Sequence, residues 1–191
     1  MPELPEVHTT VEGIKSTAVG KTIVAAWTDL LSKDKRFADS IKNPAFFKDF
    51  AVRVVGKKII RSERRAKNIL IHLSGGETIL IHMKMTGHVM YGRYDYDKKT
   101  NKWSPHADAP ESLKDPYNRF VHFVLTLNYE QHLVLCDTRK FAKVTLDKTK
   151  DIFSSKHLKD LGYEPLDAGF TLKMFKDSLS KKKTWPIKKA L

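Results

Sequence analysis

Short runs of β-branched and aromatic residues, separated by turn signals, limit most strongly how this chain can fold. The Gly75-Gly76 pair between two such runs suits a tight hairpin turn, and Asn128–Glu130 lies between another two. Many short antiparallel strands of this kind predict a β-sandwich. The expected strands are Thr22–Trp27, Val52–Ile60, Ile69–Leu73, Thr78–His82, Val121–Leu127, His132–Cys136 and Phe141–Leu146.

Helical periodicity is confined to the two ends of the sequence. Apolar residues recur on one face from Glu6 to about Ala18, and Gly20 can end that helix. Near the other end, Leu158–Gly162 has the pattern of a last helical turn, and Thr171 can cap a further helix. We therefore expect a mainly β, α+β fold: an antiparallel β-sandwich flanked by an N-terminal helix and C-terminal helical segments.

The expected organisation is a β-sandwich catalytic domain over residues 1–150, followed by a helical linker within residues 151–191. Residues 91–117 are rich in Asp, Lys, Asn and Pro and are interpreted as a long polar loop inserted between strands. Phe46–Phe50 is interpreted as a short aromatic turn of helix. Pro186–Leu191 has the pattern of a helix that is just beginning, which predicts a second domain truncated in this sequence.

The 191-residue chain carries 35 Lys and Arg against 22 Asp and Glu, a formal net charge of +13. Such a balance favours a polyanionic partner such as nucleic acid, with a basic solvated surface as the alternative. Cys136 is the only cysteine in the sequence, which excludes an internal disulfide and a four-cysteine zinc site. No apolar run is long enough to span a membrane and no signal peptide opens the chain, so we expect cytoplasmic residence and no membrane partner.

The most specific chemistry lies in the first six residues, MPELPE. Removal of Met1 would leave Pro2 with a free secondary amine, whose pKa would be near the α-amino value of about 7.7–8.0. Such an amine can attack a sugar aldehyde carbon and form an iminium, and Glu3 and Glu6 supply carboxylates for acid and base roles within one helical turn. The alternative is an ordinary helix start, because Pro and Glu both favour the first turn.

Three cations, Arg64, Arg65 and Lys67, form a compact set at an expected strand edge or turn. Arg supplies forked donors and Lys a point charge, so the set suits phosphate groups. The alternative is a charged edge strand that resists aggregation.

Two further stretches place methionine, basic and aromatic side chains at expected turns. Met85 precedes a glycine turn, and its flexible apolar side chain is suited to fill a gap in a base stack. Arg139, Lys140 and Phe141 follow a strand, where the arginine can donate a fork to a base and the phenylalanine can stack. In isolation, a core methionine and a basic hairpin loop followed by a core phenylalanine are the more ordinary interpretations.

The run PELPEVHTTVEGI, followed by VGKTI, closely resembles the N-terminus of formamidopyrimidine-DNA glycosylases, which are bacterial base-excision repair enzymes. The likeness continues to the end of the chain, apart from the expected insertion. Other motifs that carry it are Arg64–Leu70, Ile81–Gly87, Asp137–Phe141, Leu161–Leu166, Lys182–Thr184 and Ile187–Lys188.

The resemblance implies a β-sandwich N-terminal domain, then a helix–two-turn–helix domain and a C-terminal zinc finger. This sequence stops at the first helix of the second domain, and a structural zinc of the family type would need C-terminal cysteines that are absent from it. No cofactor or metal is implied for the catalytic chemistry itself.

The activity implied by the resemblance is that of a bifunctional DNA glycosylase/AP lyase acting as a monomer on damaged double-stranded DNA. It would remove oxidised purines, such as 8-oxoguanine and formamidopyrimidines, through a Schiff base on Pro2 and β,δ-elimination. In that mechanism Glu3 is the acid, Glu6 orients the site, and Lys67 approaches the DNA near the lesion.

The resemblance also implies that Met85, Arg139 and Phe141 fill the space vacated by the everted nucleotide. The family often has arginine where this chain has Lys140, which keeps a phosphate contact but loses the fork. Two alternatives stay open: an endonuclease VIII-like enzyme for oxidised pyrimidines, and an inactive truncated domain that only binds damaged DNA.

Overall fold

The computed structural model describes residues 2–180 and 184–186. The chain divides into two compact units, residues 1–152 and residues 153–191. None of the described helices is long and apolar enough to cross a membrane.

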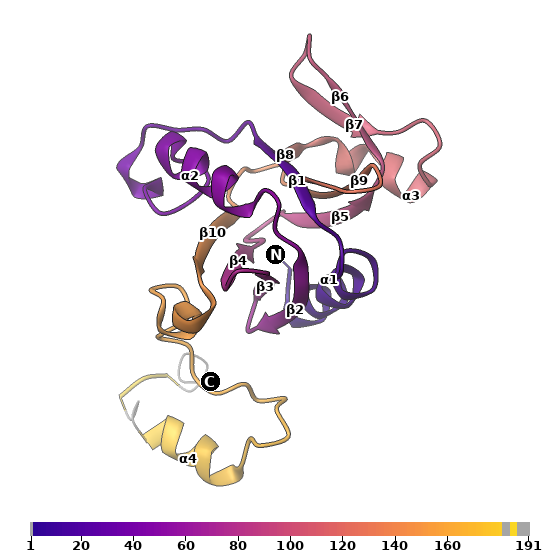
Figure 1. The fold of residues 1–191 in the computed structure, drawn as a ribbon. Helices are drawn as coiled ribbons and strands as arrows, with labels where there is room; N and C mark the ends of the chain where they lie inside the picture. The colour runs from indigo at the N-terminus through magenta and orange to yellow at the C-terminus, as the bar shows by residue number, and fades with distance from the viewer. Residues whose placement is uncertain (1, 181–183, 187–191) are drawn as a thin grey trace. The chain divides into compact units, whose positions relative to one another are not determined.

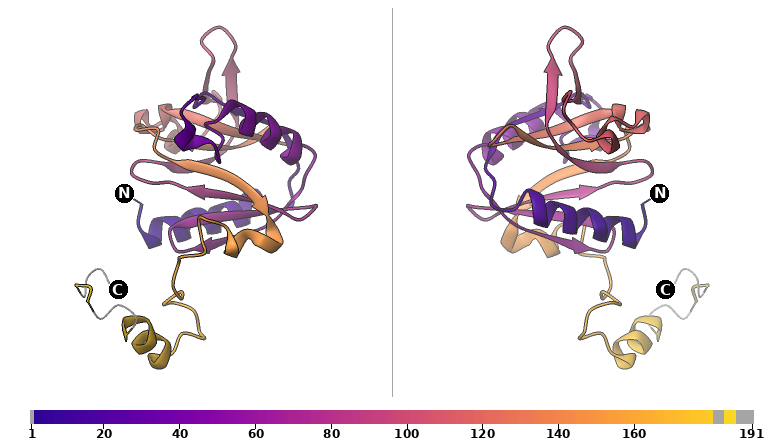
Figure 2. Two further views of the ribbon diagram at one scale, coloured as in Figure 1. Left: turned by 90° about the vertical axis from the view of Figure 1, so that its left-hand side faces the viewer. Right: turned by 90° about the vertical axis from the view of Figure 1, so that its right-hand side faces the viewer.

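Two four-stranded antiparallel sheets form the body of the first unit (Figures 1 and 2). One sheet has the order β1 (Ile23–Thr28), β8 (Val121–Leu127), β9 (Gln131–Cys136) and β5 (His88–Gly92). The other has the order β10 (Lys143–Lys148), β4 (Glu77–His82), β3 (Asn68–Leu73) and β2 (Ile59–Arg65). The prediction of a mainly β, antiparallel α+β fold is confirmed.

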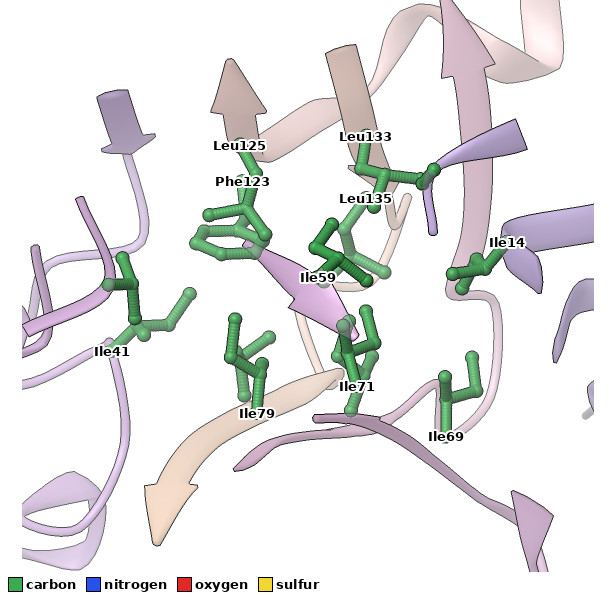
Figure 3. Packing of buried hydrophobic residues seen from close by; sticks show 14 of the residues in the cluster. Ile14, Ile41, Ile59, Ile69, Ile71, Ile79, Phe123, Leu125, Leu133 and Leu135 are labelled. Atoms are coloured by element: carbon green, nitrogen blue, oxygen red, sulfur yellow. The ribbon is translucent and has the colours of Figure 1, made fainter. Parts of the chain in front are cut away.

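A single apolar core fills the space between the two sheets. Phe123 and Leu125 of one sheet point toward Ile71 and Ile79 of the other (Figure 3), and all four side chains are at most 2% exposed. Phe123 and Leu125 are two residues apart on β8 and so face the same side of their sheet, while Ile71 of β3 and Ile79 of β4 lie opposite each other in the register of theirs. Each sheet therefore presents an apolar face to the other. Burial of these two faces is the main force that holds the two sheets together.

The first helix, α1 (Leu4–Thr17), packs against β2, β3 and β5. Its buried face is Val7, Val11 and Ile14, the face that helical spacing predicts. Ser62 Oγ of β2 donates a 3.0 Å hydrogen bond to the carbonyl oxygen of Val11, which fixes the helix on the sheet.

The second helix, α2 (Pro44–Val54), shows that the prediction of a strand over Val52–Ile60 is wrong in its first half. The Asn43 side chain accepts a 3.0 Å hydrogen bond from Phe46 N, and Pro44 begins the helix. Phe50 and Val54, four residues apart, are buried together, so core packing overrides the strand preference of the β-branched residues. Gly56, with φ of +80°, ends the helix before β2 begins.

The expected polar loop over residues 91–117 is largely ordered structure, so that prediction is wrong. It contains an antiparallel hairpin, β6 (Tyr94–Asp97) and β7 (Lys102–Pro105), followed by α3 (Glu111–Lys114) and a 3₁₀ helix, η2 (Pro116–Arg119). Figure 1 shows the hairpin projecting from the sandwich.

Aromatic rings give this hairpin a base of its own. The centroid of Trp27 on β1 lies 6.1 Å from that of Tyr96 and 6.2 Å from that of Trp103. Asn101, at the turn with φ of +53°, accepts hydrogen bonds from Trp27 Nε1 at 3.3 Å and Tyr96 Oη at 2.6 Å. In the sequence these aromatic residues are spaced among Asp, Lys, Thr and Asn, so the segment has the composition of a polar loop and the aromatic cluster is not evident.

The remaining helical elements are short. Two 3₁₀ helices are η1 (Lys35–Phe37) and η3 (Thr149–Ser154). In the second unit, Thr171 precedes α4 (Leu172–Ser180), and its Oγ1 accepts a 3.2 Å hydrogen bond from Met174 N, so the expected cap is confirmed. Leu158–Gly162 forms a turn and not the end of an α-helix. The expected helix start at residues 186–191 falls almost entirely outside the described residues, and the truncated second domain stays a prediction.

Candidate active site

A cavity of about 290 Å³ opens where the start of α1 meets the loop between β4 and β5. Three of the sequence-predicted residues, Pro2, Glu6 and Met85, line it together. The remaining lining residues are Thr10, Met83, Thr86, Gly87, His88 and Tyr117.

The first turn of α1 sets the positions of Pro2 and Glu6. Glu6 Oε2 accepts a 3.1 Å hydrogen bond from Glu3 N, so the carboxylate of Glu6 is held beside the backbone nitrogen of the residue that follows Pro2. Glu3 is the N-cap residue; its side chain is exposed and does not line the cavity. The positive end of the helix dipole at this turn disfavours a protonated amine, which favours the nucleophilic form of a free Pro2 nitrogen.

The β4–β5 loop presents Met85 to the cavity while it buries Met83. Met83 is 2% exposed and Met85 is 40% exposed. Gly87 N donates to Met83 O at 3.0 Å, and a Cβ on Gly87 would clash with that same carbonyl, so only glycine fits the turn. The loop is tight and holds its methionine at an exposed tip.

A second turn, between β9 and β10, is joined to this loop through buried Asp137. One carboxylate oxygen of Asp137 accepts a short hydrogen bond from Thr86 Oγ1 and one of 3.2 Å from Arg139 N. The other oxygen accepts from Ala142 N at 2.7 Å. Arg139 N also lies 3.2 Å from Thr86 Oγ1. The loop that carries Met85 and the turn that carries Arg139 are therefore connected.

Arg139 and Phe141 leave this turn together. The guanidinium carbon of Arg139 lies 4.5 Å from the centroid of the Phe141 ring, and Phe141 is 50% exposed. A cation stacked on an aromatic face keeps both side chains extended on the surface. The alternative interpretation of Met85 and Phe141 was that both are core residues. Both are exposed, on two loops that are connected, so neither belongs to the core.

Lys42 is a contributor that the sequence analysis missed. Its side chain is buried, and Nζ donates a 2.5 Å hydrogen bond to the carbonyl oxygen of Lys140, whose φ is +56°. Burial lowers the pKa of Lys42, while the nearby Asp137 carboxylate favours its charged form. The two lysines are 98 residues apart in sequence, and no local pattern indicates their contact.

The cationic set lies at the β2–β3 turn. Arg64 Nη1 donates to Ala66 O at 3.0 Å, and Asn68 Nδ2 donates to Arg65 O at 3.1 Å, so side chains close this turn around Ala66, whose φ is +48°. Lys67 is partly exposed and is not among the residues that line the 290 Å³ cavity.

Lys67 acts electrostatically on the neighbouring loop through His82. Burial, together with the charges of Lys84 and Lys67, lowers the pKa of His82 to about 4. The neutral ring accepts a 3.0 Å hydrogen bond at Nδ1 from Lys84 N, at the start of the Met85 loop.

Two aromatic residues that no sequence pattern indicated complete the wall of the 290 Å³ cavity. The rings of His88 and Tyr117 are stacked at 4.9 Å with an interplanar angle of 13°. Tyr117 Oη lies 3.4 Å from Thr86 O, and His88 Nε2 lies 2.8 Å from Asn118 Oδ1. Tyr117 comes from the segment that was expected to be a polar loop.

This β-sandwich, with a proline and a glutamate at the start of its first helix beside a methionine loop and an arginine turn, is the N-terminal domain of a DNA-glycosylase type of protein. Residues 1–144 match the model of the formamidopyrimidine-DNA glycosylase N-terminal domain, so the chain belongs to that family.

Curated relatives and solved structures agree with this assignment. The chain is 32% identical over 190 residues to a formamidopyrimidine-DNA glycosylase of Bartonella tribocorum and 34% identical over 184 residues to one of Bradyrhizobium, and each alignment covers 96% of this chain. It spans 57% of the length of each of these relatives. A Lactococcus lactis Fpg in complex with abasic-site DNA has the same fold, with a TM-score of 0.68 and 22% identity over 94% of this chain and 57% of that one.

Proposed function

We propose that this chain carries the catalytic domain of a bifunctional DNA glycosylase/AP lyase that excises oxidised purines, such as 8-oxoguanine and formamidopyrimidines, from double-stranded DNA. The observation that carries the proposal is the shared cavity of Pro2, Glu6 and Met85. Supporting it, the curated relatives carry the name formamidopyrimidine-DNA glycosylase, and the solved relatives include complexes with abasic-site DNA.

In the proposed reaction the free Pro2 nitrogen attacks C1′ of the damaged nucleotide, and the N-glycosidic bond breaks as the base leaves with a proton. Glu3 protonates the ring oxygen, the ring opens and an iminium forms between Pro2 and C1′. Loss of a C2′ proton expels the 3′ phosphate, and a second elimination expels the 5′ phosphate. Water then releases the sugar remnant from Pro2. Glu6 orients Pro2 through its hydrogen bond to Glu3 N.

The reaction requires eversion of the damaged nucleotide, because C1′ is not accessible within the stack. Met85, Arg139 and Phe141 occupy the vacated space, with Arg139 donating to the orphaned base. Arg64, Arg65, Lys67 and Lys140 contact phosphate groups. We propose a monomer that acts in the cytoplasm, with no metal or other cofactor in the chemical steps, since the amine and carboxylates supply them.

The test is the intact mass of the 191-residue chain before and after borohydride treatment with abasic-site DNA. Loss of Met1 together with a covalent protein–DNA adduct is the expected result, because borohydride reduces the iminium to a stable amine. Pro2→Gly retains a primary amine and should trap more slowly. Pro5→Ala, which alters the same helix start without changing the amine, is the matched control.

Three outcomes separate the proposal from its alternatives. Specific DNA binding without an adduct from a chain that begins at Pro2 would indicate a non-catalytic binder. Faster release of oxidised pyrimidines than of 8-oxoguanine would favour the endonuclease VIII-like alternative. Neither binding nor trapping would reject the proposed function altogether.

A further inference from the structure

A second cavity, of about 700 Å³, lies between the β6–β7 hairpin and the turn that carries Arg139. It is lined by the hairpin residues, the segment that leads into β8, and Thr138 and Lys140 of the turn. We propose that this cavity binds a backbone phosphate of the DNA, so that the β6–β7 hairpin extends the DNA-binding surface beyond the Pro2 cavity. This inference rests on the proposed function, because the phosphate belongs to the proposed substrate.

Two ring nitrogens of the lining residues are buried and make no hydrogen bond within the described part of the chain. Among residues 2–180 and 184–186, Trp103 Nε1 and His122 Nε2 have no hydrogen-bond partner. Trp103 Nε1–H can only donate, and a buried donor without a partner is costly. Both residues line the cavity, so an acceptor bound there could take the hydrogen bond that Trp103 Nε1–H does not make within the chain.

Asp29 holds the ring of His122 in place in the cavity wall. The Nδ1 atom of His122 lies 2.7 Å from Asp29 Oδ1, and because a carboxylate only accepts, Nδ1 carries the proton. The same pairing orients the ring.

Cations surround the opening, and the carboxylates nearby are already engaged. Lys102, Arg119 and Lys140 line the cavity with exposed side chains. Asp29 pairs with His122 and lies 3.9 Å from Lys140 Nζ. Asp97 accepts from the backbone nitrogen of Lys99 at 2.8 Å and from the Thr100 hydroxyl at 2.7 Å. The groups left to meet a ligand are therefore cations and N–H donors, which is the chemistry of a phosphate site.

Continuity with the Arg139 turn identifies the phosphate as one of the DNA backbone. Thr138 and Lys140, which flank Arg139 in sequence, line this cavity. A strand contacted by Arg139 would pass its opening, and a volume of 700 Å³ holds a phosphate with an adjoining sugar. Free inorganic phosphate is the other source of the same chemistry, and the experiment must separate the two.

The first measurement is the affinity of the full chain for a duplex that contains a stable abasic-site analogue. Fluorescence anisotropy gives this affinity at several salt concentrations over roughly 50–200 mM. The double variant Lys102→Ala/Arg119→Ala should bind about 10-fold more weakly, and its slope of log affinity against log salt should be shallower by about one. The control is Lys98→Ala/Lys99→Ala, which removes the same amount of charge from the turn of the β6–β7 hairpin, at positions that do not line the cavity. It should bind nearly as the unsubstituted chain does.

The second measurement follows the ring nitrogen signals of His122 and Trp103 by NMR in the unsubstituted chain. Shifts on addition of duplex DNA, but not of millimolar inorganic phosphate, are expected. Shifts with phosphate and none with DNA would overturn the assignment to the DNA backbone. No shift with either, or equal losses for the two double variants, would overturn the site.

Failure of this inference can be distinguished from failure of the proposed function. A chain that forms the borohydride adduct but shows no salt-slope change in the cavity variant keeps the proposed function and loses the phosphate site. A chain that neither binds nor traps abasic-site DNA loses both.

Discussion

At the scale of single residues, the buried carboxylate of Asp137 holds the two loops of the site together. Its carboxylate accepts hydrogen bonds from Thr86, Arg139 and Ala142. Asp137→Asn keeps the shape but replaces one acceptor oxygen with a donor that would face an N–H or O–H group. We expect a loss of about 2 kcal/mol in the free energy of unfolding, from hydrogen bonds to a charged group.

Thermal denaturation is the measurement for Asp137→Asn, and a fall in Tm of about 4–8 °C corresponds to that loss in a chain of this length. Thr138→Ala, one residue away and exposed, is the control and should leave Tm nearly unchanged. An unchanged Tm in Asp137→Asn would mean that the connection between the two loops does not contribute to stability.

Arg139 is the residue expected to read the base opposite the lesion. Arg139→Ala should reduce the preference for cytosine opposite the lesion by roughly 10-fold or more, since a good forked contact discriminates by about 1–3 kcal/mol. Relative cleavage rates on duplexes with each of the four opposing bases measure this. Arg93→Ala removes an exposed arginine paired with Glu130 and should keep the profile. The same profile in both variants would remove Arg139 from this role.

At the scale of elements, the β6–β7 hairpin depends on the turn residue Asn101. Asn101→Gly keeps the positive φ available but loses the two hydrogen bonds to Trp27 and Tyr96, whereas Asn101→Ala also strains the backbone by about 1 kcal/mol. Amide hydrogen exchange should therefore accelerate within residues 95–104 in the order unsubstituted, Gly, Ala, with the sandwich strands unaffected. Uniform acceleration across both sheets would mean that the hairpin is part of the global folding unit.

The elements also show what the sequence could and could not predict. Strands with continuous apolar runs, such as β3 and β9, were predicted nearly to their ends, since a short run of apolar and β-branched residues between turn signals indicates a strand buried on both faces. α2 was missed because Phe50 and Val54 gain more from helical packing than from strand preference. The hairpin was missed because its order depends on Trp27, which lies 74 residues from Asn101.

The residues of the candidate site show the same difference between what the sequence could and could not predict. Resemblance to a family located Pro2, Glu6 and Met85, which the structure brings into one cavity, while their catalytic roles stay predictions. Lys42, His88 and Tyr117 were not found, because each joins the site through contacts that only the folded chain creates. Long-range contacts leave no period and no motif in the sequence.

At the scale of the whole molecule, buried histidines make stability depend on pH. Burial lowers the pKa of His72 and His132, and lowers that of His82 to about 4. For such groups the unfolded chain binds protons first, so the penalty is absent above the unfolded pKa of about 6.5 and grows as pH falls toward 4. The free energy of unfolding should decrease across that window, with roughly 2–3 kcal/mol contributed by His82.

Denaturant unfolding between about pH 7 and pH 4, compared between the unsubstituted chain and His82→Gln, measures this contribution. The variant should lose less stability on acidification, because glutamine does not titrate. His8→Gln, at an exposed position on α1, is the control and should follow the unsubstituted chain. Parallel curves for all three proteins would place the acid sensitivity in other groups.

The bond between Asp137 and Thr86 has a consequence for how tightly DNA can be held. A surface formed by two independent loops loses conformational entropy when a ligand orders them, and that loss weakens binding. Here folding itself has already restricted both loops through one buried carboxylate. In the proposed function, Met85 and Arg139 are thus preorganised before DNA binds, and more of the contact energy that they would gain inside a duplex would remain available to unstack and bend it.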